Sequence, residues 1–196
     1  MNLLPLSHIA SVRMGVTLRG RDATRPVPNG SCYMIRIGDI NDEGQLITRE
    51  LLRFEPNESI KSDHYLRAGD ILLPNRGTRC TAYVFDLPLD GVIVGAQFYV
   101  IRVQHTKILP SYLAWFLRTT KAATHFALRR KGTLVQNVQL KDVLELELPL
   151  PSIEKQQSII ELDALLMQER ELAERLADLN QLLHQSLMLH SASSPL

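Results

Sequence analysis

The sequence is poor in cysteine and has no long apolar run. Its 196 residues include two cysteines, Cys32 and Cys80, which can form one disulfide bond at most. A disulfide-built fold is therefore excluded, and two free thiols are typical of a reducing compartment. No stretch approaches the 18 consecutive apolar residues of a membrane-spanning helix, and the N-terminus does not have the pattern of a signal peptide. We expect a cytoplasmic protein that neither spans a membrane nor is exported.

Catalytic and metal-binding motifs are also missing. The six histidines are scattered, and none shows HExxH spacing or stands beside cysteines in a zinc pattern. No lysine has an acidic residue two positions before it, which excludes the acid-x-Lys half of a common nuclease metal site. The motifs GxSxG, GxxxxGK[ST] and GxGxxG are absent as well. We therefore expect a chain that is not an enzyme and that holds no metal and no cofactor of its own.

Glycine and proline are absent from Ser152 to Leu189, although each occurs 10 times in the chain. Good helix formers dominate this stretch, so it predicts one helix of about 38 residues, roughly 57 Å long. Ser152 can cap the first turn, and Glu154 places a negative charge at the positive end of the helix dipole.

Leucines recur along this predicted helix at seven-residue steps, which is the pattern of a coiled-coil seam. The two rows are formed by Leu162, Leu165, Leu172, Leu176, Leu179 and Leu183, with Glu169 interrupting one of them. A terminal helix of ordinary length would pack on its own domain. This helix is longer than a globule of about 150 residues covers, so we expect part of the seam to bind another helix.

The net charge of +1 hides an uneven distribution. Residues 1–151 contain 19 Lys and Arg against 14 Asp and Glu, a balance of +5, whereas residues 152–196 contain 3 against 7, a balance of −4. The two parts should therefore meet different partners. We assign residues 1–151 to a globular domain, 152–190 to the helix and 191–196 to a frayed tail.

Short apolar runs alternate with turn signals before the helix, which is typical of β-strands. Strands are expected at Tyr33–Ile37, Ile71–Leu73, Ala82–Phe85, within Gly91–Val103 and at Leu144–Leu148. One or two shorter helices fit between residues 111 and 130, where three apolar residues share the spacing of a buried face: Leu113, Phe116 and Leu117. The sequence predicts an α+β fold, with one mixed globular domain followed by a long coiled-coil helix.

Three basic segments that contain glycine lie between the expected elements: Arg13–Arg25, Asn75–Arg79 and Arg129–Thr133. Arginine presents a planar fork that bonds two base atoms at once, asparagine does the same for adenine, and glycine lets the backbone approach a phosphate. Aromatic residues make up only 6% of the chain, which favours duplex DNA over a single strand that stacks on aromatic rings. We predict DNA contacts from a group of seven residues: Arg19, Arg21, Asn75, Arg76, Arg79, Arg130 and Lys131.

Two plainer interpretations of these segments stay open. The basic cluster at residues 129–131 can complement the C-terminal end of a helix that Gly132 stops. Arg76 and Arg79 can pair with acidic side chains on the surface.

Six short motifs follow one another in a recognisable order. They are Val12-x-x-Gly15-x-Thr17; Met34–Ile40; Asp63–Leu66 with Gly69–Leu73; Pro110–Leu113 with Phe116–Leu117; Gly132 with Val138-x-Leu140; and Leu148–Pro151 leading through Gln156 to Ile159. In this order the sequence resembles the specificity subunit of Type I restriction-modification systems, in a form with a single target recognition domain. The resemblance covers nearly the whole chain. Its most specific stretch is the last, which is similar to the passage from the recognition domain into the spacer helix.

The resemblance implies that the globular part reads one half of a split double-stranded DNA target, while the helix holds two such parts apart and docks methyltransferase subunits. Members of the family usually carry two recognition domains and two spacer helices, so this chain resembles half a specificity subunit. Catalysis is then expected in partner chains: a methyltransferase that binds S-adenosylmethionine and, where one is present, a restriction subunit. We expect a homodimer through the helix. The alternatives are a protein-interaction adaptor and a solitary remnant without DNA-directing activity.

Overall fold

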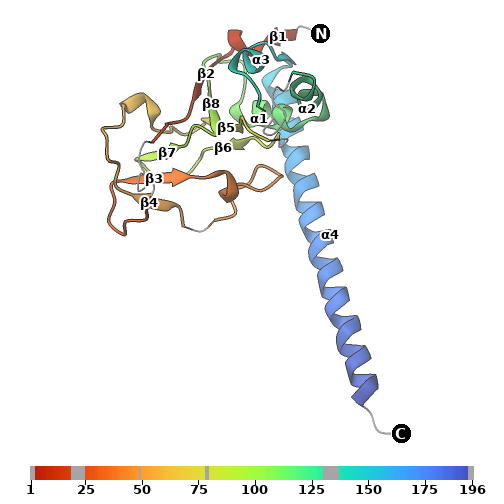
Figure 1. Cartoon of the computed structure of the whole chain (residues 1–196). Coiled ribbons are helices and arrows are strands. Elements are labelled where there is room, and N and C mark those ends of the chain that lie inside the picture. Colours follow the sequence, from red (N-terminus) through yellow and green to blue (C-terminus); the bar gives the residue numbers. More distant parts are fainter. Residues whose placement is uncertain (1–2, 19–24, 49, 78–79, 130–136, 194–196) are drawn as a thin grey trace. The chain divides into compact units, whose positions relative to one another are not determined.

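Figure 1 shows the computed structural model of the chain, which describes residues 3–18, 25–48, 50–77, 80–129 and 137–193. The chain divides into two units, residues 1–157 and residues 158–196. The first unit contains the described strands and shorter helices, and the second is helical. The predicted class, a mixed α+β domain followed by a long C-terminal helix, is confirmed.

The elements follow one another along the chain with β-strands first and most helices later. The strands are β1 (Leu3–Pro5), β2 (Ala10–Met14), β3 (Cys32–Ile35), β4 (Leu52–Phe54), β5 (Ile71–Pro74), β6 (Tyr83–Val84), β7 (Val92–Val94), β8 (Phe98–Val103) and β9 (Glu147–Pro149). The helices are α1 (Pro110–Arg118), α2 (Thr120–Ala127), α3 (Leu140–Leu144) and α4 (Ile153–Ser193).

The larger sheet has the antiparallel strand order β2-β8-β5-β6. Strand β8 lies inside this sheet, where Ile101 is opposite Val12 on one side and opposite Ile71 on the other. The predicted strand region Gly91–Val103 is divided into β7 and β8, because Gly95 and the two residues after it form a turn. This turn becomes important for the candidate site.

The three-stranded sheet has the strand order β4-β3-β7, with β3 antiparallel to β4 and parallel to β7. Alternate residues of β3 point to opposite faces of the sheet. Ile35 packs in a cluster with residues of β5 and β8, such as Leu72 and Val100. Met34 packs in a second cluster that contains Phe54. Strand β3 therefore has an apolar core on both of its faces.

Helices α1 and α2 occupy the region in which the sequence predicted helices. Leu113, Phe116 and Leu117 are all buried, which confirms the predicted face of α1. Thr119 ends α1 and begins α2, because its Oγ1 accepts a hydrogen bond from the backbone N–H of Ala122 at 3.4 Å.

The last strand is shorter than the predicted Leu144–Leu148, because residues 140–144 form α3. A carboxylate oxygen of Asp142 accepts a hydrogen bond from the backbone N–H of Gln139 at 3.3 Å, which closes a helical turn at this point. Leu146 and Leu148 are nonetheless both buried, as their alternation indicates. Strand β9 pairs antiparallel with β1, so that Leu148 lies opposite Leu4.

The first turn of α4 is fixed within the first unit by its own side chains. Ser152 Oγ accepts a hydrogen bond from the backbone N–H of Lys155 at 3.5 Å, as the sequence predicts for a cap. The pKa of Glu154 is lowered, mainly by a hydrogen bond with Ser152. Gln156 is fully buried: its Oε1 accepts from the Leu109 N–H at 2.9 Å, and its Nε2 donates to the carbonyl oxygens of residues 107 and 151 at 2.8 and 3.0 Å.

From Ser158 onward α4 forms the second unit. It ends at Ser193, three residues beyond the predicted boundary at 190, since no glycine or proline occurs before Pro195. Along the part of the chain that the structure describes, no helix has an apolar stretch of the length needed to cross a membrane.

Candidate nucleic-acid interface

Some charged residues of the quoted motifs serve the frame of the first unit. Asp70 is 1% exposed, in the turn before β5. Its two carboxylate oxygens accept hydrogen bonds from Arg102 of β8 at 2.7 and 2.6 Å, and the backbone N–H of Arg67 donates to it at 2.9 Å. The pKa of Arg102 is raised, mainly by its hydrogen bonding with Asp70. The pair fixes β8 to the start of β5.

Arg13, the first basic residue of the segment Arg13–Arg25, is also part of the frame. It is partly buried on β2, and its Nη2 donates to the carbonyl oxygen of His64 at 3.1 Å. Burial is the main cause of the lowered pKa of Arg13. A guanidinium held in this way is not available as a free surface group.

Arg36 stands at the end of β3 and keeps an exposed side chain. Its backbone N–H donates to the buried carboxylate of Asp39 at 2.7 Å, and its Nη2 is 3.3 Å from the same carboxylate. The side chain of Arg36 is nevertheless 54% exposed, against 8% for Asp39. The motif Met34–Ile40 therefore places one arginine at the surface in a defined position.

A groove of about 380 Å³ lies between four segments that are far apart in the sequence. Its lining includes Thr17, Leu18, Arg36, Arg76, Ala96 and Gln97, and we call it the Arg76 groove. Gly15 allows the first segment to approach the turn between β7 and β8, because a Cβ atom there would lie 2.1 Å from the carbonyl oxygen of Gly95.

Asn75 joins the segments around this groove through three hydrogen bonds. Its Nδ2 donates to the carbonyl oxygen of Ala96 at 2.8 Å, and its backbone N–H donates to that of Gln97 at 2.9 Å. Its own carbonyl oxygen accepts from the N–H of Val138 at 3.0 Å. Since Asn75 is only 5% exposed, these bonds hold the wall of the groove together.

Two of the seven predicted DNA-contacting residues lie in the described part of the chain, Asn75 and Arg76. Arg76 is exposed, lines the Arg76 groove and forms an isolated β-bridge with Asn137. The other five lie outside the described residues: Arg19, Arg21, Arg79, Arg130 and Lys131. Each of the three predicted basic segments has a described residue in or beside the Arg76 groove. Thr17 belongs to the first segment and Arg76 to the second, and both line the groove. Asn137, which follows the third segment, pairs with Arg76.

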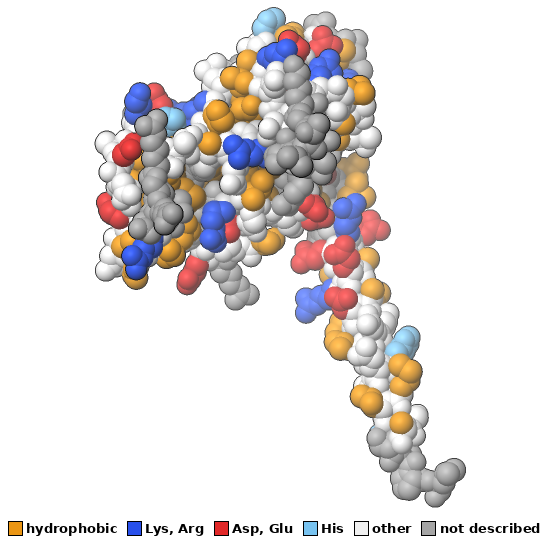
Figure 2. Space-filling model, in the orientation of Figure 1, with side chains coloured by type: hydrophobic (Ala, Val, Ile, Leu, Met, Phe, Trp, Pro, Cys, Tyr) orange, Lys and Arg blue, Asp and Glu red, His pale blue; other side chains and the backbone are white. Residues whose placement is uncertain are grey.

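Arg36 and Gln97 line the same groove, and sequence reasoning missed both. Clusters of basic residues predict DNA contacts, and neither of these two residues belongs to such a cluster in the sequence. A usable signal for Gln97 is its place in the turn that follows Gly95, between two apolar strands. Figure 2 shows that the Lys and Arg side chains on the visible face of the first unit are dispersed and do not form one continuous basic patch.

The exposed surface of α4 is apolar along the predicted seam. The six leucines of the two rows are between 55% and 62% exposed. Figure 2 shows hydrophobic side chains and acidic side chains along this helix. A helix that leaves six leucines in water is suited to bind a second helix.

In the residues that the structure describes, no three His, Cys, Asp or Glu side chains form a group that could hold a metal ion.

Comparison with known proteins gives one family. A sequence model described as the Type I restriction modification DNA specificity domain matches residues 22–174. No curated protein sequence matches the chain.

Three solved structures share the fold. The crystal structure of the HsdS subunit from Thermoanaerobacter tengcongensis has a TM-score of 0.64 at 18% identity, over 89% of this chain and 39% of that one. The crystal structure of the Type-I restriction-modification system S subunit from M. genitalium gives 0.57 at 13% identity, over 94% and 44%. A third structure, described by "complex assembly" and "conformational transition of the type I R-M system", gives 0.65 at 19% identity, over 92% and 43%. The chain thus spans 39–44% of the length of these three.

Proposed function

Because the chain belongs to the family of Type I restriction modification DNA specificity domains, as its motifs indicated, we propose that it recognises one half of a two-part double-stranded DNA target. The family provides specificity and not catalysis. The chain then directs partner subunits to the target and carries out no reaction itself.

The observation that supports this proposal is the meeting of four segments at the Arg76 groove. Arg76, Arg36 and Gln97 come from different parts of the sequence and line one surface. Arginine bonds guanine and glutamine bonds adenine in the major groove, each through two hydrogen bonds. Several such side chains around one groove are what direct reading of a short base sequence requires.

The helix α4 supports a second part of the proposal, which concerns assembly. Its two leucine rows pair antiparallel with those of a second copy, so that a homodimer carries two identical recognition units. A two-fold dimer of this kind prefers a target made of two inverted half-sites with a fixed gap. The acidic character of residues 152–196 suits protein partners better than DNA.

The partners follow from the family. A methyltransferase subunit supplies the methyl transfer and binds S-adenosylmethionine, and a restriction subunit joins where one is encoded. This chain needs no cofactor of its own. The complex works where the DNA is, in the cytoplasm.

The test measures mass and methylation together. Light scattering gives the mass of the purified chain alone and mixed with the methyltransferase encoded beside it, and methylation mapping then identifies the modified sequence. A dimer alone or a two-plus-two complex, with methylation at an inverted two-part sequence, is expected. A stable complex without sequence-dependent methylation contradicts the proposal and points to a protein-interaction adaptor. A monomer in both samples contradicts it as well and points to a solitary remnant.

A further inference from the structure

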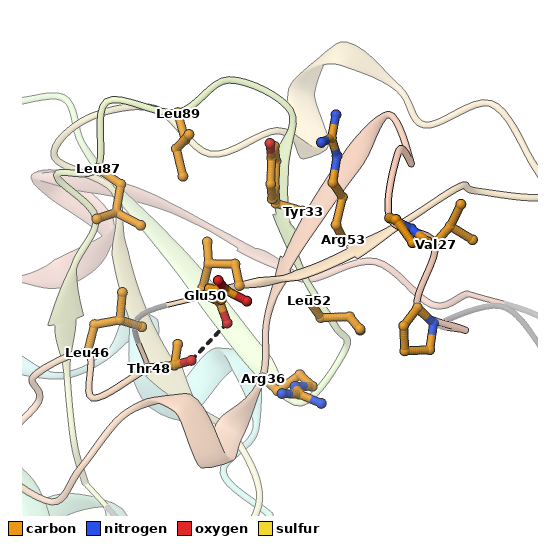
Figure 3. A pocket seen from close by; sticks show the side chains of 13 residues that line it. Val27, Tyr33, Arg36, Leu46, Thr48, Glu50, Leu52, Arg53, Leu87 and Leu89 are labelled. Atoms are coloured by element: carbon orange, nitrogen blue, oxygen red, sulfur yellow. Dashed lines mark hydrogen bonds between the residues drawn. The ribbon is translucent and has the colours of Figure 1, made fainter.

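A second groove, with a volume of about 710 Å³, lies on the three-stranded sheet of the first unit (Figure 3). Tyr33 of β3 and Arg53 of β4 are directly opposite each other in the antiparallel pair, so both side chains stand on the same face. Figure 3 shows them side by side, with Leu87 and Leu89 across the groove and Glu50 between. We call this the Tyr33 groove.

Arg53 is exposed, yet its guanidinium group is held in position from two sides. Its Nε donates to the carbonyl oxygen of Gly30 at 2.6 Å. The guanidinium carbon lies 5.3 Å from the centre of the Tyr33 ring, in a cation–π contact. Gly30 permits this approach, because a Cβ atom there would lie 2.3 Å from the carbonyl group of Phe54.

These contacts occupy one edge and one face of the guanidinium group. Within the described residues, no acceptor contacts its two Nη groups, which form the remaining fork. A fork in a fixed orientation matches two acceptors at a fixed separation, such as O6 and N7 of guanine in the major groove. A phosphate contact requires no such fixed orientation, since a mobile lysine or arginine provides it equally well.

The other groups in the groove have the chemistry of base recognition. The carboxylate of Glu50 can accept a hydrogen bond from the N4 amino group of cytosine, the partner of guanine. Leu87 and Leu89 offer an apolar surface of the kind that contacts a thymine methyl group or a sugar. An arginine and an acid in one groove therefore suit a G·C base pair.

The Tyr33 groove is continuous with the interface described above. Arg36 lines both grooves. The first basic segment also connects the two grooves: Thr17 and Leu18 within it line the Arg76 groove, and Pro26 to Pro28 directly after it line the Tyr33 groove. A duplex bound along the first unit would meet both.

We propose that Arg53, positioned by Tyr33 and Gly30, is a specificity-determining residue that reads a guanine in the half-site. This inference rests on the proposed DNA-recognition function. It adds a base-reading position that lies outside all three basic segments of the sequence.

The experiment compares target motifs selected from a random duplex library. The complex of the full chain with its methyltransferase is the probe, and it is made with the natural sequence and with Arg53→Ala. We expect the variant to lose the preference for guanine at one position of the motif and to keep the others. Affinity for the natural target should fall roughly 5- to 150-fold, while affinity for targets altered at that position stays nearly unchanged.

Each result has a separate meaning. If the natural complex selects no motif, the proposed function fails and this inference falls with it. If the natural complex selects a motif and Arg53→Ala keeps every position of it, the inference alone is overturned. An equal loss of affinity for all sequences also overturns it, because that is the behaviour of a phosphate contact.

Additional variants separate base reading from folding. Arg53→Lys keeps the positive charge and the aliphatic stem but has no planar fork, so it should lose the same guanine preference. Tyr33→Leu removes the ring under the guanidinium group and should weaken that preference only in part. Arg67→Ala is the matched control, because Arg67 is an exposed arginine whose side chain, among the residues that the structure describes, makes only a 3.8 Å ion pair with Asp63. Its motif should be that of the natural complex.

Discussion

The carboxylate of Asp70 receives three hydrogen bonds, two from the side chain of Arg102 and one from the backbone of Arg67. Such a buried acid stabilises the fold only while all of its partners remain. Position in a family motif therefore does not by itself indicate a ligand contact. The residues that we propose to read bases in this unit, Arg53 and Arg76, are exposed instead.

Asp70→Ala should destabilise the chain by about 3 kcal/mol, because it leaves the Arg102 guanidinium partly buried without its partner. The loss is measured as a shift of the urea unfolding midpoint. Replacing both residues with leucine should recover most of it, since a buried ion pair is often no more stable than apolar side chains of similar volume. Asp63→Ala serves as control: its ion pair with Arg67 is exposed, so a change within about 0.5 kcal/mol is expected. A loss of stability for Asp63→Ala as large as that for Asp70→Ala would contradict the stabilising role assigned to the buried Asp70–Arg102 pair.

Arg76→Ala tests the proposed DNA interface. Among the described residues, Arg76 is the one arginine that the sequence predicts to contact DNA, and it is exposed. If Arg76 reads a base, binding to the natural target should weaken by about 1–3 kcal/mol and one target position should become relaxed. The measurement is fluorescence anisotropy with a set of duplexes that differ at single positions. Unchanged binding to every duplex would remove Arg76 from the interface.

Helix α4 and the stretch just before it differ in how well their secondary structure could be predicted. Helix α4 is determined by its local sequence, because composition, cap and leucine spacing all favour a helix over the same residues. The stretch from residue 140 to 149 is ambiguous, since alternating leucines suit a strand while Gln139 and Asp142 close a helical turn. Tertiary pairing with β1 decides where the strand begins, and that contact is far away in the sequence.

Gln156 holds the first turn of α4 to residues 107–109 and to Pro151, and its replacement tests that role. Gln156→Leu leaves the Leu109 N–H and two carbonyl oxygens without this partner, so stability should fall by about 1–3 kcal/mol. Urea unfolding of the full chain measures the loss. Gln157→Leu is the matched control, because Gln157 is the same residue type, one position later and exposed. An equal effect of the two variants would show that the buried hydrogen bonds of Gln156 contribute nothing.

The leucine rows of α4 determine what we expect of the assembled molecule. Leu172→Gln combined with Leu179→Gln removes two apolar contacts from the proposed helix pair, so the mass measured by light scattering should fall from dimer to monomer. Ala164→Gln with Ala177→Gln adds the same polar groups at exposed positions outside the rows and should leave the dimer intact. A double leucine variant that stays dimeric would place the interface elsewhere.

The structure of the whole molecule could be predicted from the sequence where it depends on neighbouring residues, and could not where distant segments meet. Residue types marked the basic segments, the helix and most strands. Two sets of contacts join residues that are 21 to 63 positions apart in the sequence. They are the parallel pairing of β3 with β7 and the hydrogen bonds of Asn75 with Ala96, Gln97 and Val138. Such contacts arise from packing of the complete core, so the grooves that they form had no signature in the sequence.

The pairing of β1 with β9 brings the beginning of the globular unit beside the residues that lead into α4. A polypeptide joined ahead of Leu3 would start at the edge of the unit from which the helix departs, without passing through the core. Tandem gene duplication can therefore link one copy's helix to the next copy's first strand at little cost in folding.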